Sequence, residues 1–350
     1  MNKNSYLHDF LSNLPDFVFD YIEIYYSGES INTQIGYCID LRIFLEYLIK
    51  FKFKEKSSPE EFTCADIAAV TAEDIIRFKA YLREYQSEYV SPDGKLIRRT
   101  RKNSNYGINR KLSSVRGLFS YLYKTDKIPQ NITDKVDMNK LHQKIKKPLT
   151  TQETVRLLDV LYNGEKTFTG RYLTEYLRTK QRDIAILVSY LGTGVRVSEL
   201  VNLDIKDVCF DTSSFIVTRK GGDEQEIYMP VQVENELGEY LKIRCGEEAK
   251  DKDALFISRQ GSRMTVSSVE KMLKKYCLAA GITDSDKARP HALRRTFACR
   301  LLEDGVDIKM VAELMGHKNI EVTHKFYAQY NSAAKREIMR SIDVTGDIKN

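Results

Sequence analysis

The chain has 350 residues, 42% of them hydrophobic, so it is long enough for two domains that each bury an ordinary core. No apolar run approaches the roughly 20 residues of a membrane span, and the N-terminus lacks the charged-then-apolar pattern of a secretory signal, so we expect a cytoplasmic protein without membrane association. Few glycines and prolines, and six scattered cysteines without C-x-x-C spacing, predict a mostly helical protein with neither a zinc site nor a disulfide framework.

The net charge of +6 is unevenly distributed along the chain. Residues 1–90 contain 9 Lys and Arg against 15 Asp and Glu, whereas residues 91–150 contain 15 against 4. A basic segment of this kind, between flanks without a large positive excess, is typical of a nucleic-acid contact surface. Taken alone, the same run would equally fit a solvated, disordered linker.

The first part of the chain is predicted to be helical. Apolar residues recur at helical spacing over residues 14–27, 32–52, 71–85 and 104–123. Thr71 and the acids that follow it are typical of a helix start, and residues 91–94 (SPDG) are typical of a turn. We expect these helices to form one all-α domain over residues 1–130.

The helix predicted over residues 104–123 has an apolar and a polar face. Its apolar stripe consists of Ile108, Leu112, Val115, Phe119 and Leu122. The adjoining polar face carries Asn109, Ser113 and Arg116, with Arg110 and Lys111 beside it. Together with the basic residues just before the helix, this face is a candidate contact surface for an anionic partner.

Residues 131–147 are predicted to be a basic linker, followed by a second domain over residues 148–331. This domain has predicted helices at 182–190, 195–203, 231–245, 264–279, 291–304, 307–315 and 319–328. Strands are expected at 208–210, 215–219 and 226–229, with Gly221 and Gly222 marking a hairpin. The fold class is therefore mainly α with a small antiparallel β-sheet, the second domain being α+β. No GxxxxGKS, GxGxxG or HExxH motif is present, so nothing indicates a nucleotide or metal site.

Histidines are concentrated near the C-terminus, where His291, His317 and His324 fall within 34 consecutive residues. His291 and Arg294 are three residues apart, so they share one helical face. With Gly316-His317 and Tyr327 they would form a cationic pocket that contains one candidate nucleophile. Such a pocket suits a phosphodiester, because Arg presents a planar fork of donors to phosphate oxygens.

Four motifs occur together in a specific order: GVRVSEL at 194–200, RKGG at 219–222, HALR at 291–294, and Gly316-His317 followed ten residues later by Tyr327. In this combination the chain resembles the tyrosine recombinases, the phage-integrase and Xer-type site-specific DNA recombinases. Residues 108–116 (INRKLSSVR) are similar to that family's DNA-contacting helix. The resemblance is closest to the single-recombinase Xer proteins of the XerS kind, through DIAI (183–186), VNLDIKD (201–207), TRKGG (218–222) and SSVEKM (267–272).

The resemblance implies a set of six catalytic residues: Arg196 and Arg294 as the clamp on the scissile phosphate, Lys220 as general acid for the leaving 5′ oxygen, His291 as base or hydrogen-bond donor, His317 as a phosphate contact, and Tyr327 as the nucleophile. Glu199 is expected to pair with Arg196 and orient it. Where the family usually has a His after the second Arg, this chain has Arg295, and we do not expect this departure to abolish activity.

Ordinary alternatives exist for several of these residues. A lysine at a hairpin tip, as Lys220 is expected to be, is usually only solvated, and a histidine is more often a satisfied core residue than a catalytic one. Tyr330 lies only three residues after Tyr327 in a chain with 21 tyrosines. His324 is expected to give local support without belonging to the catalytic set.

The resemblance also implies partners: double-stranded DNA with paired half-sites, and self-association to a tetramer on that DNA, with no metal, ATP or other cofactor. The predicted DNA contacts are Arg98, Arg99, Arg101, Lys102, Asn109, Arg110, Lys111 and Arg116. A role in chromosome dimer resolution would add a DNA translocase of the division machinery and a place at the bacterial nucleoid. Residues 332–350 are predicted to form a tail helix that docks either on its own domain or on the neighbouring protomer.

Three other functions remain open from the sequence. An integrase of a mobile element would use the same chemistry. A type IB topoisomerase-like enzyme fits the two-domain layout less well, and an inert DNA-binding protein would not need all six catalytic residue types.

Overall fold

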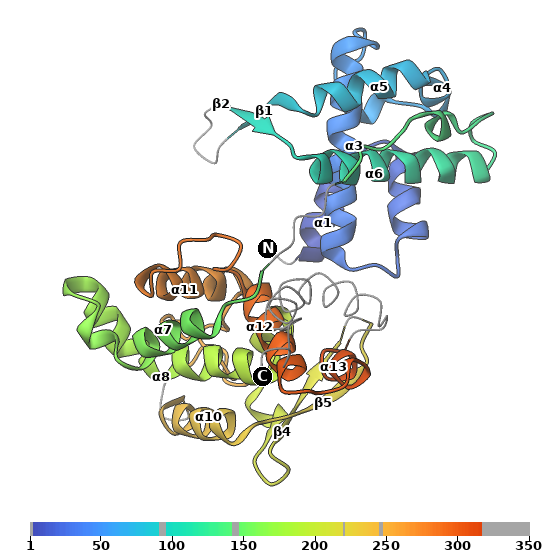
Figure 1. Ribbon diagram of the computed structural model, residues 1–350. Helices are drawn as coiled ribbons and strands as arrows, with labels where there is room; N and C mark the ends of the chain where they lie inside the picture. Colours follow the sequence, from blue (N-terminus) through green and yellow to red (C-terminus); the bar gives the residue numbers. More distant parts are fainter. Residues whose placement is uncertain (1–2, 91–95, 142–146, 220, 245–247, 317–350) are drawn as a thin grey trace, which may run out of the picture. The chain divides into compact units, whose positions relative to one another are not determined.

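The computed structural model describes residues 3–90, 96–141, 147–219, 221–244 and 248–316 (Figure 1). The chain forms two compact units, the first ending at Gln143 and the second beginning at Lys144. Both are mainly helical with small antiparallel sheets, so the predicted fold class is confirmed. No helix in the described part of the chain is both long and apolar enough to cross a membrane.

The first unit is built around two long helices, α3 (Ile31–Phe51) and α6 (Asn105–Lys124). Their apolar stripes share one core, in which the ring of Phe44 on α3 lies 6.3 Å from that of Phe119 on α6. The shorter helices around them are α1 (Lys3–Leu11), α2 (Asp16–Asp20), α4 (Cys64–Ala68) and α5 (Ala72–Tyr81). As predicted, Thr71 starts α5: its hydroxyl accepts from the backbone of Asp74, whose carboxylate accepts from the backbone of Thr71.

A β-hairpin in the first unit corrects the expectation of an all-α domain. The short helices α1 and α4 were not predicted either. Strands β1 (Glu84–Val90) and β2 (Leu96–Lys102) pair in antiparallel register, with Glu84 opposite Lys102 and Val90 opposite Leu96. The strands project from the helical part of this unit (Figure 1). Since most of its residues are polar or charged, the hairpin has no apolar face to mark it as a strand pair in the sequence.

The first unit also extends further along the chain than the predicted boundary at residue 130. A 3₁₀ turn at Ile132–Lys135 places Ile132 and Val136 in the first core. Asn131 caps this turn, its side-chain oxygen accepting from the backbone and hydroxyl of Thr133. The segment expected to be a linker from residue 131 is therefore, in its first part, a packed element of the first unit.

The second unit is organised around α8 (Gly170–Thr193), which is buried along its second half from Asp183 onward. The helices α7 (Thr151–Tyr162), α9 (Val197–Asn202), α10 (Val231–Arg244), α11 (Val266–Ala279), α12 (Pro290–Glu303) and α13 (Ile308–Leu314) complete the helical part. A three-stranded antiparallel sheet has the order β3 (Val208–Cys209), β4 (Ser214–Thr218) and β5 (Glu224–Tyr228). The helix predicted over 319–328 lies outside the described residues.

Glycines with positive φ shape the end of α8 and the turn of the β4–β5 hairpin. Gly194 ends α8 in the left-handed region, with φ of 62°, and a side chain there would collide with the ring of Phe297 on α12. Gly221 and Gly222 also have positive φ, 108° and 91°, and close the turn after β4. Gly194 allows α8, α9 and α12 to meet closely, and the candidate site lies where they meet.

Candidate active site

Arg196 is positioned by the first turn of α9. It is the residue before the helix, and its backbone N–H donates to Oε2 of Glu199 at 2.8 Å while its guanidinium donates to Oε1 at 2.7 Å. The expected pairing with Glu199 is thus confirmed, although Glu199 is buried and its side chain is only 4% exposed. The Arg196 side chain remains 36% exposed, so it can still reach a ligand.

Arg294 lies near the start of α12, in its second turn, and is almost completely buried, with 5% exposure. Its guanidinium donates to the backbone carbonyls of Gly194 and Met315. Burial, followed by the positive charge of Arg196, lowers the pKa of Arg294 to about 10, so the side chain is still a cation at neutral pH. Among the described residues the hydrogen bonds of Arg294 go to neutral carbonyl groups, so its charge is available to an anion.

A third arginine, Arg219, joins this cluster and was not among the predicted site residues. It follows β4, is 9% exposed, and donates from Nη1 to both carboxylate oxygens of Glu199 at 2.8 Å. Its Nε donates to the side chain of Gln225 on β5 at 2.7 Å. Its position beside Lys220 in the RKGG motif was visible in the sequence. Its inward orientation continues the alternation of β4, in which Phe215 and Val217 are buried.

The charges of the cluster do not balance. Three guanidinium groups surround one carboxylate, so the described part of the site has an excess of two positive charges. Burial alone would favour the neutral form of Glu199, but hydrogen bonds from Arg196 and Arg219 outweigh it and lower its pKa. The carboxylate is therefore ionised and fully used in holding the arginines, which leaves the excess charge available to a phosphate.

Of the remaining predicted catalytic residues, His291 lies in the part of the chain that the structure describes. His291 is exposed and lies in the first turn of α12, three residues before Arg294 on the same helix. The structure therefore brings Arg196 and Arg294 together and puts His291 on the helix that carries Arg294. Outside the described residues lie Lys220, His317, Tyr327 and the tail from 332 to 350. Gly316, the residue directly before His317, accepts a hydrogen bond from Arg196 at 3.2 Å.

The polar residues predicted as DNA contacts on α6 have intramolecular partners. Asn109 exchanges two hydrogen bonds of 2.9 Å with the backbone of Asn139, and Arg116 donates to the carbonyls of Thr133 and Val136. These contacts hold the segment after α6 against the helix. The polar face of α6 thus has a structural role in the first unit beside any role in DNA binding.

Arg110 and Lys111 meet the buried carboxylate of Asp40 on α3. Arg110 donates to Asp40 at 2.7 Å while 54% of its side chain stays exposed, whereas Lys111 is 10% exposed and lies 3.8 Å from the carboxylate. Burial raises the pKa of Asp40 against the effect of these two cations, and burial lowers the pKa of Lys111. Of the two, Arg110 is the one that still presents its charge to solvent.

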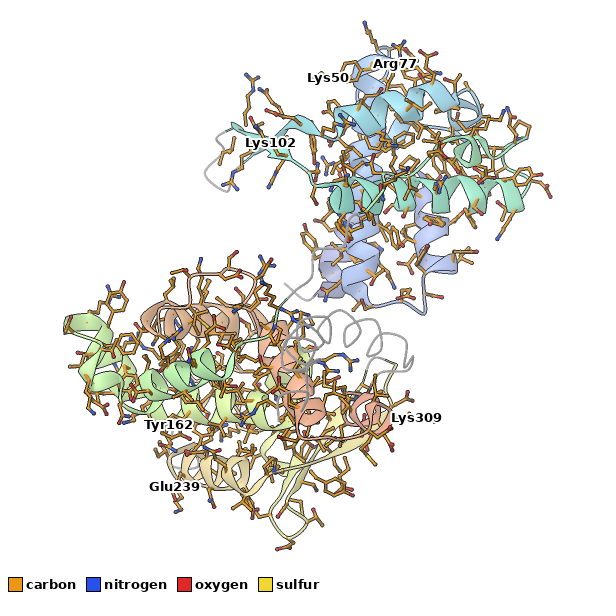
Figure 2. The ribbon with its side chains drawn as sticks, in the orientation of Figure 1. Lys50, Arg77, Lys102, Tyr162, Glu239 and Lys309 are labelled. Carbon is orange, nitrogen blue, oxygen red and sulfur yellow. The ribbon has the colours of Figure 1, made fainter. Side chains whose placement is uncertain are left out.

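The predicted contacts on the hairpin, Arg98, Arg99, Arg101 and Lys102, are all exposed on β2. Figure 2 shows Lys102 at the hairpin, away from the helical core of this unit. Arg101 donates to the hydroxyl of Ser87 across the hairpin at 3.2 Å, and Lys102 forms an ion pair with Glu84 at 3.2 Å. Side chains on the two faces of the hairpin therefore have different partners.

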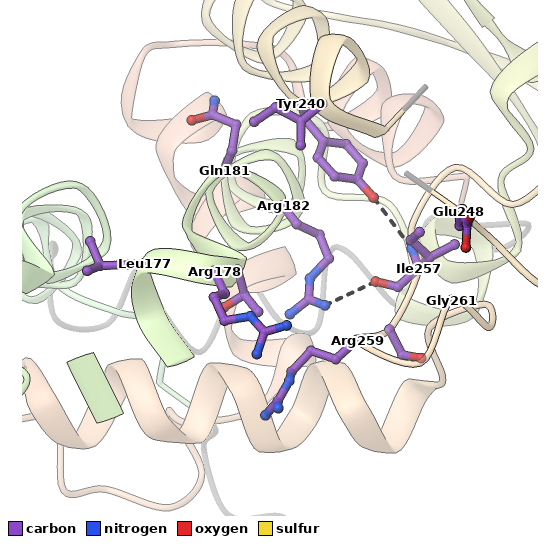
Figure 3. Close-up of a pocket in the computed structure, with 12 residues that line it drawn as sticks. Leu177, Arg178, Gln181, Arg182, Tyr240, Glu248, Ile257, Arg259 and Gly261 are labelled. Atoms are coloured by element: carbon purple, nitrogen blue, oxygen red, sulfur yellow. Dashed lines mark hydrogen bonds between the residues drawn. The ribbon is translucent and has the colours of Figure 1, made fainter. Parts of the chain in front are cut away.

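A separate pocket of about 280 Å³ lies between α8, α10 and the loop before α11 (Figure 3). Arg182 on its wall donates to the carboxylate of Asp183 and to the carbonyl of Ile257. Tyr276 and Thr179 complete the bonds of the same carboxylate. This network is internally satisfied and shares no residue with the arginine cluster, so the pocket is not a part of the candidate active site.

Comparison with known proteins identifies the family. A family model described as the phage integrase family matches residues 147–334. The chain is 30% identical over 316 residues to the tyrosine recombinase XerC of Caldanaerobacter subterraneus subsp. tengcongensis, covering 89% of this chain and 81% of that protein. It is 28% identical over 354 residues to the tyrosine recombinase XerS of Streptococcus thermophilus, covering 95% of this chain and 97% of that protein.

Solved structures show the same fold. The XerH site-specific recombinase bound to a palindromic difH substrate is similar with a TM-score of 0.63 and 19% identity, covering 89% of this chain and 80% of that one. The Tn1549 transposon integrase in complex with transposon right end DNA has a TM-score of 0.61 and 24% identity, covering 93% and 99%. With the family model matching more than half of its length, the chain belongs to the phage integrase family and is a tyrosine recombinase of the Xer type.

Proposed function

We propose that this protein is a site-specific DNA recombinase that cuts and rejoins DNA through a 3′-phosphotyrosine formed by Tyr327. The observation that carries this proposal is the cluster of Arg196, Arg219 and Arg294 with Glu199, which has an excess of positive charge, in a chain of the tyrosine recombinase family. Attack on a phosphodiester adds negative charge to the phosphoryl oxygens, and fixed cations stabilise that charge in the transition state.

The reaction follows from the chemistry of these groups. The Tyr327 hydroxyl loses its proton to a base, for which His291 is proposed, and forms a bond to phosphorus. The bond from phosphorus to the 5′ oxygen breaks, and Lys220 supplies the proton that this oxygen needs. Arg196, Arg294 and His317 hold the phosphoryl oxygens throughout. Because the phosphotyrosine keeps the energy of the broken bond, a 5′ hydroxyl of another strand can attack it without ATP.

A plasmid assay tests this function. The target is first selected from random duplexes by binding, and two copies are placed in one supercoiled plasmid. A recombinase yields product circles that depend on both copies, whereas a topoisomerase-like enzyme only relaxes the plasmid and an inert binding protein does neither. We expect product circles both with and without EDTA, because arginines stabilise the negative charge of the transition state. A rate that collapses in EDTA and returns with Mg²⁺ would assign the chain to another class of enzyme.

DNA and a second copy of the chain are the proposed partners. The palindromic substrate of the XerH structure is consistent with paired half-sites, each occupied by one protomer. We propose assembly to a tetramer on two duplexes, with residues 332–350 as the candidate connection between protomers. For a role in chromosome dimer resolution, the proposal adds a DNA translocase of the division machinery and a place at the nucleoid in the cytoplasm. Integration of a mobile element is the alternative with the same chemistry.

One face of the β1–β2 hairpin is the proposed DNA contact of the first unit. Residues directly opposite in an antiparallel pair lie on the same face. One face therefore places Glu84 opposite Lys102, and these two side chains form an ion pair at 3.2 Å, while the backbone register sets Arg98 opposite residue 88. The other face pairs Ser87 with Arg99 and Tyr85 with Arg101, so its strand residues include two cations and no acid.

The positive face also lies near the basic part of α6. The charge of Arg101 acts on Lys111 of α6, adding to the effect of burial that lowers the pKa of that lysine. Arg110, whose side chain is half exposed, directly precedes Lys111 on α6. The cations of this face thus continue along α6, and a two-stranded ribbon of this kind fits the major groove of double-stranded DNA.

The two faces provide a matched test by salt dependence. Replacing Arg99 and Arg101 with Ala removes two phosphate contacts, so the slope of log K against log salt should fall by up to about 1.8. The control variant, with Arg98 and Lys102 replaced by Ala, loses the same charge from the face of the Glu84–Lys102 ion pair and should change the slope much less. Filter binding or fluorescence anisotropy over a range of salt concentrations measures both. Equal changes in the two variants would contradict the assignment of one face.

A further inference from the structure

Arg219 connects three segments of the candidate active site. Its Nη1 donates to both oxygens of Glu199 on α9, and its Nε donates to Gln225 on the next strand of the sheet. Its guanidinium also packs against Gly316: a Cβ on that glycine would lie 2.5 Å from Cζ and from Nη2 of Arg219. One buried side chain therefore touches α9, the β4–β5 hairpin and the turn after α13.

Each of these segments also carries or directly precedes a proposed catalytic residue. Arg196 holds Glu199 through its backbone and its guanidinium, so α9 connects to the phosphate clamp. The backbone of Arg219 fixes the hairpin turn itself, since its N–H donates to the carbonyl of Asp223 at 2.7 Å and its carbonyl accepts from Gly222 at 3.0 Å. Gly316 accepts a hydrogen bond from Arg196 and directly precedes His317.

The hydrogen bonds and ion pair of Arg219 do not maximise the stability of the folded protein. Its Nη2 is buried and has no hydrogen-bond partner among the described residues. An unsatisfied buried donor is costly, and a buried ion pair is often no more stable than apolar residues of similar volume. Glu199 would also keep its two bonds to Arg196 without Arg219. The distinctive contribution of Arg219 is therefore geometric: it fixes the hairpin and the turn before His317 relative to α9.

We propose that Arg219 is a positioning residue for DNA cleavage, which aligns the segments of Arg196, Lys220 and His317 through Glu199, Gln225 and Gly316. This inference rests on the proposed function of the site. Displacement of catalytic groups by about 1 Å can lower a rate by about 10²-fold. Binding of DNA, in contrast, depends on many phosphate contacts elsewhere, so Arg219 should affect the rate of cleavage and leave the affinity for DNA unchanged.

The test compares Arg219→Met with a matched control, Arg263→Met. Arg263 also pairs with carboxylates, those of Asp204 and Asp251, and donates to backbone carbonyls. Within the described part of the chain, its side-chain hydrogen bonds and ion pairs reach only the end of α9 among the proposed catalytic segments. Each full-length variant is given a nicked duplex of the selected target at saturating concentration. The readouts are the rate of covalent adduct formation, the dissociation constant for DNA, and the melting temperature.

We expect the rate to fall by about 10²-fold in Arg219→Met and to stay near the wild-type rate in Arg263→Met. Arg219→Lys, which keeps the charge but not the fork of donors, should lie between them and serves as the test variant if the Met variant does not fold. An unchanged rate in Arg219→Met, or losses in both variants that follow only the melting temperature, would overturn the inference. Absence of adduct in the wild-type protein would instead refute the proposed function, and the inference with it.

A double-mutant cycle with Glu199→Gln distinguishes positioning from general packing. If Arg219 acts through Glu199, its replacement in the Glu199→Gln background should lower the rate by much less than the 10²-fold expected in the wild-type background. Independent, additive losses of rate would contradict action through Glu199.

Discussion

Tyr327→Phe should form no covalent adduct with DNA while binding the target with unchanged affinity. Only the attacking hydroxyl is removed, and phosphate contacts elsewhere in the chain supply the affinity. Without the hydroxyl no bond to phosphorus forms, so the loss is expected to be complete and not merely a reduction in rate. A nicked target traps the adduct, which a denaturing gel separates from free DNA.

The matched control for this variant is Tyr330→Phe. Tyr330 is three residues away and would be the next candidate for the nucleophile. We expect Tyr330→Phe to form adduct at nearly the wild-type rate. Adduct in the Phe variant at position 327, together with its loss in the variant at 330, would assign the nucleophile to Tyr330.

Arg294→Met should lower the rate of cleavage by about 10³-fold, because it removes a preorganised donor and a full charge from the phosphate site. The carbonyls of Gly194 and Met315 lose their partner, which costs about 1–3 kcal/mol, less than the stability of a typical domain. The variant should therefore fold and bind DNA. Arg295→Met, a change at the neighbouring residue of α12, serves as the control and should retain most activity.

Replacement by lysine gives this prediction a pH signature. Burial lowers the pKa of Arg294 to about 10, yet the side chain stays charged at neutral pH because an arginine starts from a high value. A lysine starts lower, and the same burial would move its pKa toward neutrality. Since cleavage needs the cation, the activity of Arg294→Lys should fall as the pH rises through that lowered pKa. A rate equal to that of the wild type at every pH would contradict the role of Arg294.

Periodicity and spacing predicted the helical framework and the relation between Arg196 and Glu199. Residues three or four apart on a helix start are neighbours whatever the rest of the fold does, so that pair followed from local geometry. The buried second half of α8 was similarly visible as a continuous apolar segment. Its polar first half was not, because only Tyr176 and Thr179 are buried before residue 183.

Features that depend on distant partners could not be read from the sequence. The polar face of α6 has the pattern of a solvent-exposed surface, yet Asn109 and Arg116 bind a segment 17 to 30 residues further along. The same segment, with Ile132 and Val136 buried, has too few apolar residues to distinguish it from a linker. Arg219 is buried only because Glu199, twenty residues earlier, supplies a charged partner in the interior.

Mapping the site of covalent attachment tests the central claim most directly. The wild-type protein is trapped on a nicked target in EDTA, digested with a protease, and the peptide that carries DNA is identified by mass spectrometry. We predict a single linked peptide with Tyr327 joined to the 3′ phosphate of the cleaved strand. Attachment to the 5′ end, to another residue, or no attachment without added metal would contradict the account.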